Sequence, residues 1–531
     1  MHSPDKSGAA GERQHVAWLG RTTARGTGVL AGAMLVVRLC GLVREMVVAR
    51  RFGLADELAA YLLGLVLVAL VNSLLGEALR ECFVAAYLRR RREGGGHDPS
   101  RSDLFWPVLA QGLAAALAVA ALLWAAYPTL LPLLGRQLKP ATVELAVRLA
   151  RLCAWLIPIQ FAVAMGDALL HAARRFAPSG IAPAAIPLGI VAALTLWPEG
   201  GVQSMVAGFY GGAAVRLAVV FWAARDLVPP LRRAGGGTRE VWSAWRFQAG
   251  LAAVASVNMA VDRFMGAFLG EQPLVALGYA MTLTHIFERF WIVTVVTALL
   301  PPLAAMWGDG RRDAARSGLG TSLQVMLLLV APLSVLACFL SSDAVALLYQ
   351  RGDFTFEATR QTAPVVAMYA LGWPTIAVLS VAARGCIVAD RMGIMGWIAG
   401  YELVSNTLLN LLLMRWLGAP GIALATSILY AGSAWIICSY LTRTAGFPLL
   451  GAVREAARVA VPALAVEAAG LLALARLFPR AGAAGPGALL ARLALLGAAG
   501  LLLYGLAVWL IGRGLIRPWW RGLRGARQPA P

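Results

Sequence analysis

Charged residues are scarce in this sequence of 531 residues. They make up 14% of it, whereas apolar residues make up 59%. About a quarter of the residues of a typical soluble domain are charged, so this chain has too little charge to solvate a globular surface. Acidic residues are scarcer still, 27 against 47 basic ones, and the formal net charge is +20. The composition therefore predicts a protein whose surface faces lipid.

The sequence also lacks the patterns on which many soluble functions depend. The basic residues fall in short clusters between apolar runs instead of gathering, which argues against nucleic-acid binding. Its six cysteines are dispersed, without metal-like spacing. We find no ordered acid pair, P-loop, nucleophile elbow or metal cluster in the short loops, so we predict neither an enzyme nor a cofactor. The first 25 residues contain no short apolar core and are predicted to be a cytoplasmic tail instead of a signal peptide.

Long apolar runs fill the rest of the chain. A helix needs about 20 apolar residues to cross roughly 30 Å of hydrocarbon, and fourteen runs meet this length. The predicted fold is an all-α polytopic membrane protein with these spans: 27–43, 57–88, 104–134, 142–172, 178–197, 201–224, 241–269, 273–307, 318–341, 357–388, 392–414, 419–442, 455–477 and 486–512.

The distribution of basic residues predicts the orientation. Most basic loop residues face the cytoplasm when the N-terminus is placed there, as the positive-inside rule requires. We therefore predict a multi-pass protein of the bacterial inner membrane with both termini in the cytoplasm. The exception is the first outside turn, which would hold Arg44, Arg50 and Arg51.

The two halves of the chain show a faint internal repeat. The fourth span ends in His171-Ala-Ala-Arg-Arg-Phe-Ala-Pro and the tenth in Ala383-Arg-Gly-Cys-Ile-Val-Ala-Asp-Arg391, and the sixth and twelfth are both rich in Gly and Ala. The alternative is that alternating loops give any membrane protein basic turns at even intervals. We predict a tail (1–26), an N-lobe of six helices (27–240), a C-lobe of six (241–445), two further helices (446–512) and a basic cytoplasmic tail (513–531).

Four stretches of sequence resemble the MurJ/MviN family. Residues 37–53, Val-Arg-Leu-Cys-Gly-Leu-Val-Arg-Glu-Met-Val-Val-Ala-Arg-Arg-Phe-Gly, resemble its first-helix signature. Val261-Asp-Arg-Phe-Met-Gly-Ala-Phe-Leu and Leu277-Gly-Tyr-Ala280 resemble its seventh and eighth helices, and Tyr349-Gln-Arg-Gly-Asp-Phe-Thr355 resembles the element before helix ten. The matches lie in order over residues 30–445.

The resemblance implies a fold and a function. It implies two pseudo-repeated six-helix lobes plus two C-terminal helices, as in the MOP exporter superfamily. It also implies a flippase that moves lipid II, or a related undecaprenyl-diphosphate-linked saccharide, across the inner membrane by alternating access around a central cationic cavity. Membrane lipids and cell-envelope synthases are the further partners we expect. An exporter of exopolysaccharide or O-antigen repeat units, a drug or cation antiporter, and a transport-inactive scaffold for envelope synthases remain alternatives.

Ionisable residues inside spans are the candidate substrate contacts, because a charge near the bilayer centre costs about 2.5 to 3.5 kcal/mol. Arg38 and Arg44 match the family's motif arginines and could grip a diphosphate bidentately. Alternatively, Arg44 reaches water at the membrane edge and Arg38 pairs with Glu77. Glu77, Arg80 and Glu81 share one helix face, which also allows local ion pairing.

The second set of candidates lies in the seventh and eighth spans. Asp262 and Arg263 match the family's Asp-Arg, and His285, Glu288 and Arg289 occupy one helix face. His285 could carry a proton, although a lone histidine more often makes one structural hydrogen bond.

The chain departs from the family pattern at three positions. The family's usual second-helix Asp and Arg fall near Ala60 and near Asn72 or Ser73, and Met281-Thr282 replaces Asp-Arg after Tyr279-Ala280. We expect His285, Glu288 and Arg289 to supply replacement polarity one turn later, for a different head group.

Overall fold

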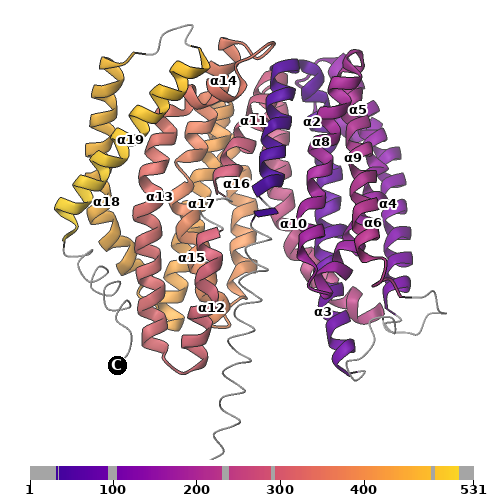
Figure 1. Ribbon diagram of the computed structural model, residues 1–531, viewed down its shortest axis with the longest axis horizontal. Helices are drawn as coiled ribbons and strands as arrows, with labels where there is room; N and C mark the ends of the chain where they lie inside the picture. The colour runs from indigo at the N-terminus through magenta and orange to yellow at the C-terminus, as the bar shows by residue number, and fades with distance from the viewer. Residues whose placement is uncertain are drawn as a thin grey trace, which may run out of the picture. The chain divides into compact units, whose positions relative to one another are not determined.

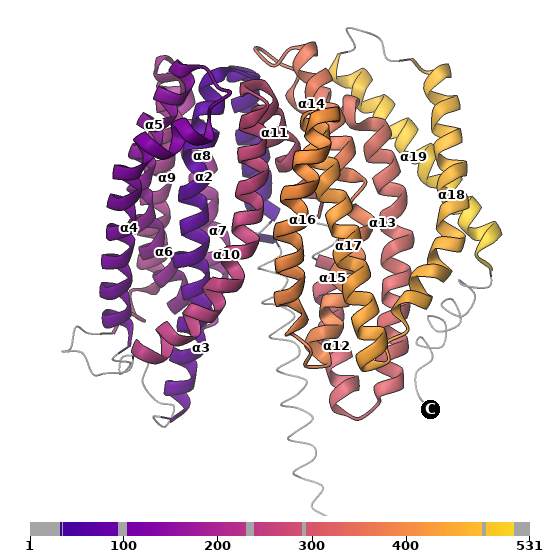
Figure 2. The ribbon, with the colours of Figure 1, turned by 180° about the vertical axis from the view of Figure 1, so that it is seen from behind.

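The computed structural model describes residues 32–33, 35–93, 104–229, 238–288, 294–479 and 485–513. Within these ranges all regular secondary structure is helical and there is no strand (Figure 1). Figure 2 shows the same helices from behind. The prediction of an all-α fold is confirmed.

Contacts divide the chain into two compact units. Unit 1 comprises Met1–Val47, Leu67–Thr129 and Val147–Ala253, and unit 2 comprises Val48–Val66, Leu130–Ala146 and Val254–Pro531. Several helices therefore contribute residues to both units. The predicted lobe limits, 27–240 and 241–445, stay predictions.

The helices follow one another with short connections. Up to the end of α10 the elements are a helix over residues 35–52, α2 (Asp56–Val71), η1 (Asn72–Glu77), α3 (Ala78–Glu93), α4 (Phe105–Leu134), α5 (Pro140–Ala154), α6 (Leu156–Ala172), α7 (Phe176–Ile181), η3 (Ala182–Ala184), α8 (Ala185–Leu196), η4 (Pro198–Gly200), α9 (Gly201–Ala224) and α10 (Thr238–Phe268). They continue with α11 (Glu271–Phe287), α12 (Thr294–Gly308), α13 (Arg312–Tyr349), α14 (Phe356–Ala370), α15 (Trp373–Val388), α16 (Ile394–Leu417), α17 (Ala419–Ala445), α18 (Leu449–Leu477) and α19 (Pro486–Ile511).

Eleven helical stretches of the described chain are long and apolar enough to cross a membrane. Each corresponds to one of the fourteen predicted spans. The other three predicted spans also contain helix: the helix over 35–52, the pair α11 and α12, and α16. The pattern of long apolar runs thus predicts where the membrane helices lie.

Helix α16 is less apolar than the eleven long stretches because one of its faces is polar. Glu402, Asn406 and Asn410 follow one another at four-residue intervals, which places them on one side of the helix. Its outer side carries Trp397 and Trp416, each 81% exposed. Nineteen residues separate them, which in a helix is about 28 Å and close to the roughly 30 Å thickness of hydrocarbon. The two tryptophans thus have the spacing of interfacial anchors of a membrane helix.

Glycines bring two pairs of neighbouring helices into backbone contact. A Cβ on Gly212 of α9 would lie 2.4 Å from the Ala185 carbonyl oxygen of α8, and one on Gly421 of α17 would lie 2.3 Å from the Leu413 carbonyl oxygen of α16. Small residues allow this close packing in membrane helices. Close helix packing at a glycine therefore occurs between the fifth and sixth spans and again between the eleventh and twelfth, in line with the six-plus-six repeat.

The first described helix runs further than the sequence predicts. The expected span ends at residue 43, with Arg44, Arg50 and Arg51 in an outside turn, but the helix continues to residue 52. The physical reason is that residues 44–52 contain no glycine or proline, and the next glycine is Gly53, which has a positive φ of 49°. Arg44 is therefore a helical residue, and its side chain pairs with Glu45.

Three of the quoted sequence motifs meet at Gly53. The Asp353 amide donates to the Arg50 carbonyl oxygen over 2.9 Å, and the Tyr279 hydroxyl donates to the Gly53 carbonyl oxygen over 3.1 Å. A Cβ on Gly53 would lie 2.2 Å from the Asp353 carbonyl oxygen. The motif ending in Arg-Phe-Gly and the motif Arg-Gly-Asp-Phe-Thr are therefore two sides of one junction in unit 2.

Replacing Gly53 with alanine should destabilise the protein by about 3 kcal/mol, because the residue would be strained at positive φ and would clash with backbone. Thermal unfolding in detergent measures this loss. Gly400→Ala on α16 is the matched control, because nothing lies within 4 Å of its Cβ position. Equal stability of the two variants would show that the junction is not the tight contact described.

The last two helices, α18 and α19, are fastened to α13 by polar contacts. Arg492 of α19 pairs with the buried Asp343 of α13. The Tyr504 hydroxyl of α19 donates to the Leu328 carbonyl oxygen over 2.9 Å. At the other end, Gln324 of α13 donates to Glu455 of α18 over 2.8 Å. These contacts fix the C-terminal pair on unit 2 at several levels.

Candidate functional site

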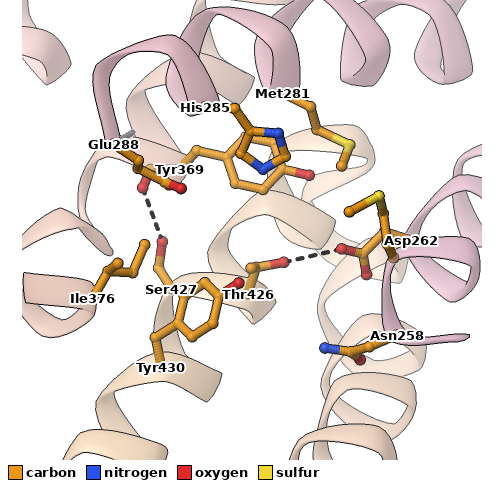
Figure 3. Close-up of a pocket in the computed structure, with 11 residues that line it drawn as sticks. Asn258, Asp262, Met281, His285, Glu288, Tyr369, Ile376, Thr426, Ser427 and Tyr430 are labelled. Carbon is orange, nitrogen blue, oxygen red and sulfur yellow. Dashed lines mark hydrogen bonds between the residues drawn. The ribbon is translucent and has the colours of Figure 1, made fainter. Parts of the chain in front are cut away.

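A polar cavity of about 90 Å³ lies inside unit 2 (Figure 3). This is room for a few water molecules or one polar group of a ligand. Residues of α10, α11, α14, α15 and α17 line it, together with Glu288, which follows α11. The lining residues are Asn258, Met259, Asp262, Met281, His285, Glu288, Tyr369, Ile376, Thr426, Ser427 and Tyr430.

Asp262 is a buried acid of this cavity that accepts several hydrogen bonds. It is 6% exposed, and its Oδ1 accepts from the side-chain amides of Asn406 over 2.7 Å and Asn410 over 2.8 Å. The Thr426 hydroxyl approaches Oδ2 at 3.4 Å, as Figure 3 shows. A buried carboxylate is tolerated only with such donors, because removing it from water without them costs several kcal/mol. The polar face of α16 therefore serves to hold Asp262.

The remaining lining groups make the cavity rich in acceptors. His285 and Glu288 come from one face of α11 and its end, and the tyrosines Tyr369 and Tyr430 face them (Figure 3). The Ser427 hydroxyl donates to the Met368 carbonyl oxygen over 2.6 Å. No arginine is among the lining residues in the part of the chain that the structure describes. The cavity can thus accept hydrogen bonds from hydroxyl and amide donors better than it can bind phosphate.

Three of the predicted site residues come together in this cavity. They are Asp262, His285 and Glu288. Arg263 is half-buried beside Asp262 on α10 and does not line the cavity, and Arg289 lies outside the described residues. Met281, where the family pattern has an acid, is also in the lining, one turn before His285. His285 and Glu288, two of the three residues expected to replace the polarity of the family's acid, therefore line the same cavity as Met281.

The other four predicted residues belong to unit 1. Arg38 and Arg44 are half-buried on the helix over 35–52. Glu77 is exposed at the end of η1, and Arg80 is half-buried one turn later on α3. The neighbouring Glu81 accepts from Gln248 of α10 over 3.1 Å.

A π-helical turn that the sequence did not predict ends at Glu77. It spans Asn72–Glu77, where the family pattern has its second-helix arginine. Such turns are rare and occur often at functional sites, because they rotate the side chains that follow. Its position next to Glu77 and Arg80 makes this helix segment a candidate for substrate contact.

A buried ion pair in unit 1 was also missed. Asp167 of α6, with its side chain 2% exposed, accepts from Arg216 of α9 over 3.0 Å. His171, one turn further along α6, lies 3.0 Å from the Ser179 hydroxyl. The sequence shows one acid and one base inside two predicted spans. It does not show that these two spans are neighbours in the fold.

Breaking this ion pair should be costly. We expect Asp167→Ala to destabilise the protein by about 3 to 5 kcal/mol, because Arg216 is left as an unpaired, largely buried charge. Unfolding in detergent at neutral pH measures the effect.

An exposed pair in the same unit provides the control. Arg175 donates to both carboxylate oxygens of Asp226, over 2.7 and 2.5 Å. The hydrogen bonds from Arg175 lower the pKa of Asp226, so the pair contributes stability at neutral pH that is lost as the pH falls through that pKa. The Asp226→Ala variant should nevertheless stay close to the wild type. Equal losses of stability in Asp167→Ala and Asp226→Ala would contradict the assignment of Asp167 and Arg216 as a buried ion pair.

Few groups in the described residues have the chemistry of a metal site. No cluster of three or more His, Cys, Asp or Glu side chains occurs there, and the six cysteines are free. Asp262 with its carboxamide and hydroxyl neighbours is an oxygen-rich set, which is the ligand type that hard cations prefer. As placed, both amides donate to the carboxylate, so they would have to turn over to offer oxygen to a cation.

Long apolar helices that enclose ionisable groups define a polytopic membrane protein with a polar interior. A solved structure described as lipid II flippase MurJ in an inward closed conformation has the same fold, with a TM-score of 0.76 and 20% identity, over 92% of this chain and 99% of that one. An inward-facing multidrug resistance MATE family transporter of the MOP superfamily matches with a TM-score of 0.63 and 16% identity, over 80% of this chain and 98% of the other. The fold is therefore the one that MOP transporters share.

Sequence comparison identifies the family. The family model described as lipid II flippase MurJ matches residues 48–491, well over half of the chain. A probable lipid II flippase MurJ of Thermotoga maritima is 24% identical over 396 residues, covering 74% of this chain and 80% of that protein. One of a Synechocystis species is 23% identical over 438 residues, covering 76% and 79%. The chain belongs to the MurJ family of lipid II flippases, a family of transporters.

Proposed function

We propose that this chain moves lipid II, or a closely related undecaprenyl-diphosphate-linked saccharide, across the bacterial inner membrane by alternating access. The family match over residues 48–491 is the observation that carries this proposal. No covalent step is involved, because the cargo changes sides without a bond being made or broken. Both termini lie in the cytoplasm in this proposal, as the positive-inside rule favours.

The polar groups of the chain fit the two chemical parts of such a cargo. Arg38 and Arg44 carry guanidiniums that can bind phosphate oxygens bidentately, and Arg80 adds a third. The acceptor-rich cavity with Asp262, His285 and Glu288 suits the hydroxyl and amide donors of a saccharide or peptide. The proposal therefore assigns diphosphate recognition to the arginines of unit 1 and recognition of donors to the cavity of unit 2.

One observation supports a modified cargo as the second candidate. Met281 lines the cavity of unit 2 where the family pattern has an acid, and His285 and Glu288 provide polarity further along α11. A pocket that changes the position of its acceptors selects a ligand with differently placed donors. The head group would then differ from lipid II in its saccharide or peptide portion, as in an exporter of another repeat unit, and not in its diphosphate.

Complementation in a strain depleted of its own lipid II flippase tests this proposal. Wild-type protein should restore growth, and Arg38→Ala, produced at the same level in the membrane, should not. Failure of the wild type together with normal membrane insertion would contradict lipid II as the cargo. Rescue by wild type and Arg38→Ala alike would contradict the role of Arg38.

A further inference from the structure

Glu467 is a buried acid to which the proposed transport function assigns no role. It lies in the second half of α18 and is 0% exposed. Neither of its carboxyl oxygens has a hydrogen-bond partner among the residues that the structure describes. This sets it apart from Asp167, Asp262 and Asp343, each of which has a polar partner on another helix.

The surroundings of Glu467 are apolar and tightly packed. A Cβ on Gly500 of α19 would lie 3.4 Å from Oε1 of Glu467, so the carboxyl group sits where α19 lacks a side chain. Leu336, Leu340, Leu471 and Leu496 form a buried cluster at the same seam of α13, α18 and α19. A carboxylate without donors in such a setting is strongly disfavoured relative to the neutral acid.

The charged groups on the packed helices do not neutralise this acid. On α13 and α19 the nearest ones along the helices, Asp343 and Arg492, pair with each other, and they lie about two helical turns from Leu336 and Gly500. Tyr504, one turn beyond Gly500, donates its hydroxyl hydrogen to Leu328, and Cys338 of α13 donates to the Ala367 carbonyl oxygen.

The charged residues of α18 itself are equally distant. The basic ones closest in sequence, Arg458 and Arg476, are both exposed, and each is nine residues away. Among the residues that the structure describes, the seam therefore offers Glu467 no counter-ion.

We propose that Glu467 is a proton-binding site that latches the helix pair α18 and α19 onto α13. With the proton in place, the carboxylic acid is neutral and the seam stays dry and closed. When the proton passes to water, the carboxylate that remains needs water or a cation, and the seam between α18, α19 and α13 opens to admit it. The polar contacts at Arg492, Tyr504 and Glu455 hold the pair while the middle of the seam opens. This inference is independent of the cargo.

Infrared spectroscopy of the full-length protein in lipid membranes tests the proton directly, because a protonated carboxyl group and a carboxylate absorb at different frequencies. The wild-type spectrum minus that of Glu467→Gln at neutral pH should show the loss of one protonated carboxyl band. Glu199→Gln, at an exposed position outside this seam, should show the loss of a carboxylate band instead. Loss of a carboxylate band in Glu467→Gln would overturn the proposal.

Hydrogen exchange tests the latch. At a pH high enough to remove the protonated band of the wild type, amides of α18 and α19 near Glu467 should exchange several-fold faster than in Glu467→Gln at the same pH. At low pH the two proteins should exchange alike. Glu467→Met provides a second variant without an acid, should the glutamine variant not fold. Equal exchange of wild type and both variants at every pH would refute an opening linked to this proton.

Discussion

Replacement of Arg38 by alanine is expected to abolish the movement of the lipid-linked saccharide between leaflets, while the protein still inserts into the membrane at the wild-type level. A guanidinium that grips a diphosphate makes charge-assisted hydrogen bonds, each contributing about 1.5 to 3 kcal/mol. Loss of two such bonds lowers transfer by roughly a hundredfold or more, since each 1.4 kcal/mol is a factor of ten. A transport assay with membrane level measured in parallel tests this.

Arg50→Ala is the control for this variant. Arg50 lies on the same helix over 35–52 and is exposed, whereas Arg38 is half-buried. Arg38→Lys should recover only part of the activity, because a lysine cannot bind two oxygens in the planar geometry of a guanidinium. Wild-type transfer by Arg38→Ala would remove Arg38 from the binding site.

The second large effect is expected at Asp262. Asp262→Ala should reduce transport by at least about a hundredfold, because the variant removes an acceptor from the cavity and leaves the amides of Asn406 and Asn410 without their partner. Each buried donor left unpaired costs about 1 to 3 kcal/mol. The same variant should therefore also unfold at lower temperature, and transport is compared at a temperature where it is folded.

Asp262→Asn separates charge from shape. It keeps an oxygen for one amide but loses the negative charge, so we expect it to fold better than Asp262→Ala and to transport as poorly. The exposed Asp313, whose side chain is 96% accessible, gives the control Asp313→Ala, which should behave as wild type. Full activity of Asp262→Asn would show that the carboxylate charge is not needed.

Much of the fold could be predicted from the sequence, because the length of an apolar run can be determined from one continuous stretch of residues. Each of the eleven membrane-crossing stretches coincides with a predicted span. One predicted span differs from the helix found. The span predicted at 27–43 is part of a helix that continues to residue 52, because arginines at a helix end do not stop a helix and Gly53 does.

The site was predictable only in part, because it depends on which helix faces meet. Asp262, His285 and Glu288 were found as charges inside spans, and they line one cavity. Asn406 and Asn410, which hold Asp262, were missed although they lie one turn apart on a membrane helix, a spacing that could have revealed them. The pairing of Asp167 with Arg216 could not be foreseen, since nothing local to either residue identifies the partner helix.

The cavity also refines the expectation of a cationic site. Its lining in unit 2 holds carboxyl groups, a histidine and tyrosines, whereas Arg38, Arg44 and Arg80 belong to unit 1. A substrate with an anionic diphosphate and a donor-rich saccharide or peptide portion can be bound by both sets. Assigning the two chemistries to different groups makes the roles of Arg38 and Asp262 separately testable.

The central claim is that this chain transfers a polyprenyl-diphosphate-linked saccharide between leaflets. Purified protein in liposomes, with lipid II or a defined relative in one leaflet and a probe that modifies only the opposite leaflet, measures this directly. We predict transfer with wild-type protein that is lost in both Arg38→Ala and Asp262→Ala. Transfer no faster than in protein-free liposomes, for every lipid-linked saccharide tried, would contradict the account.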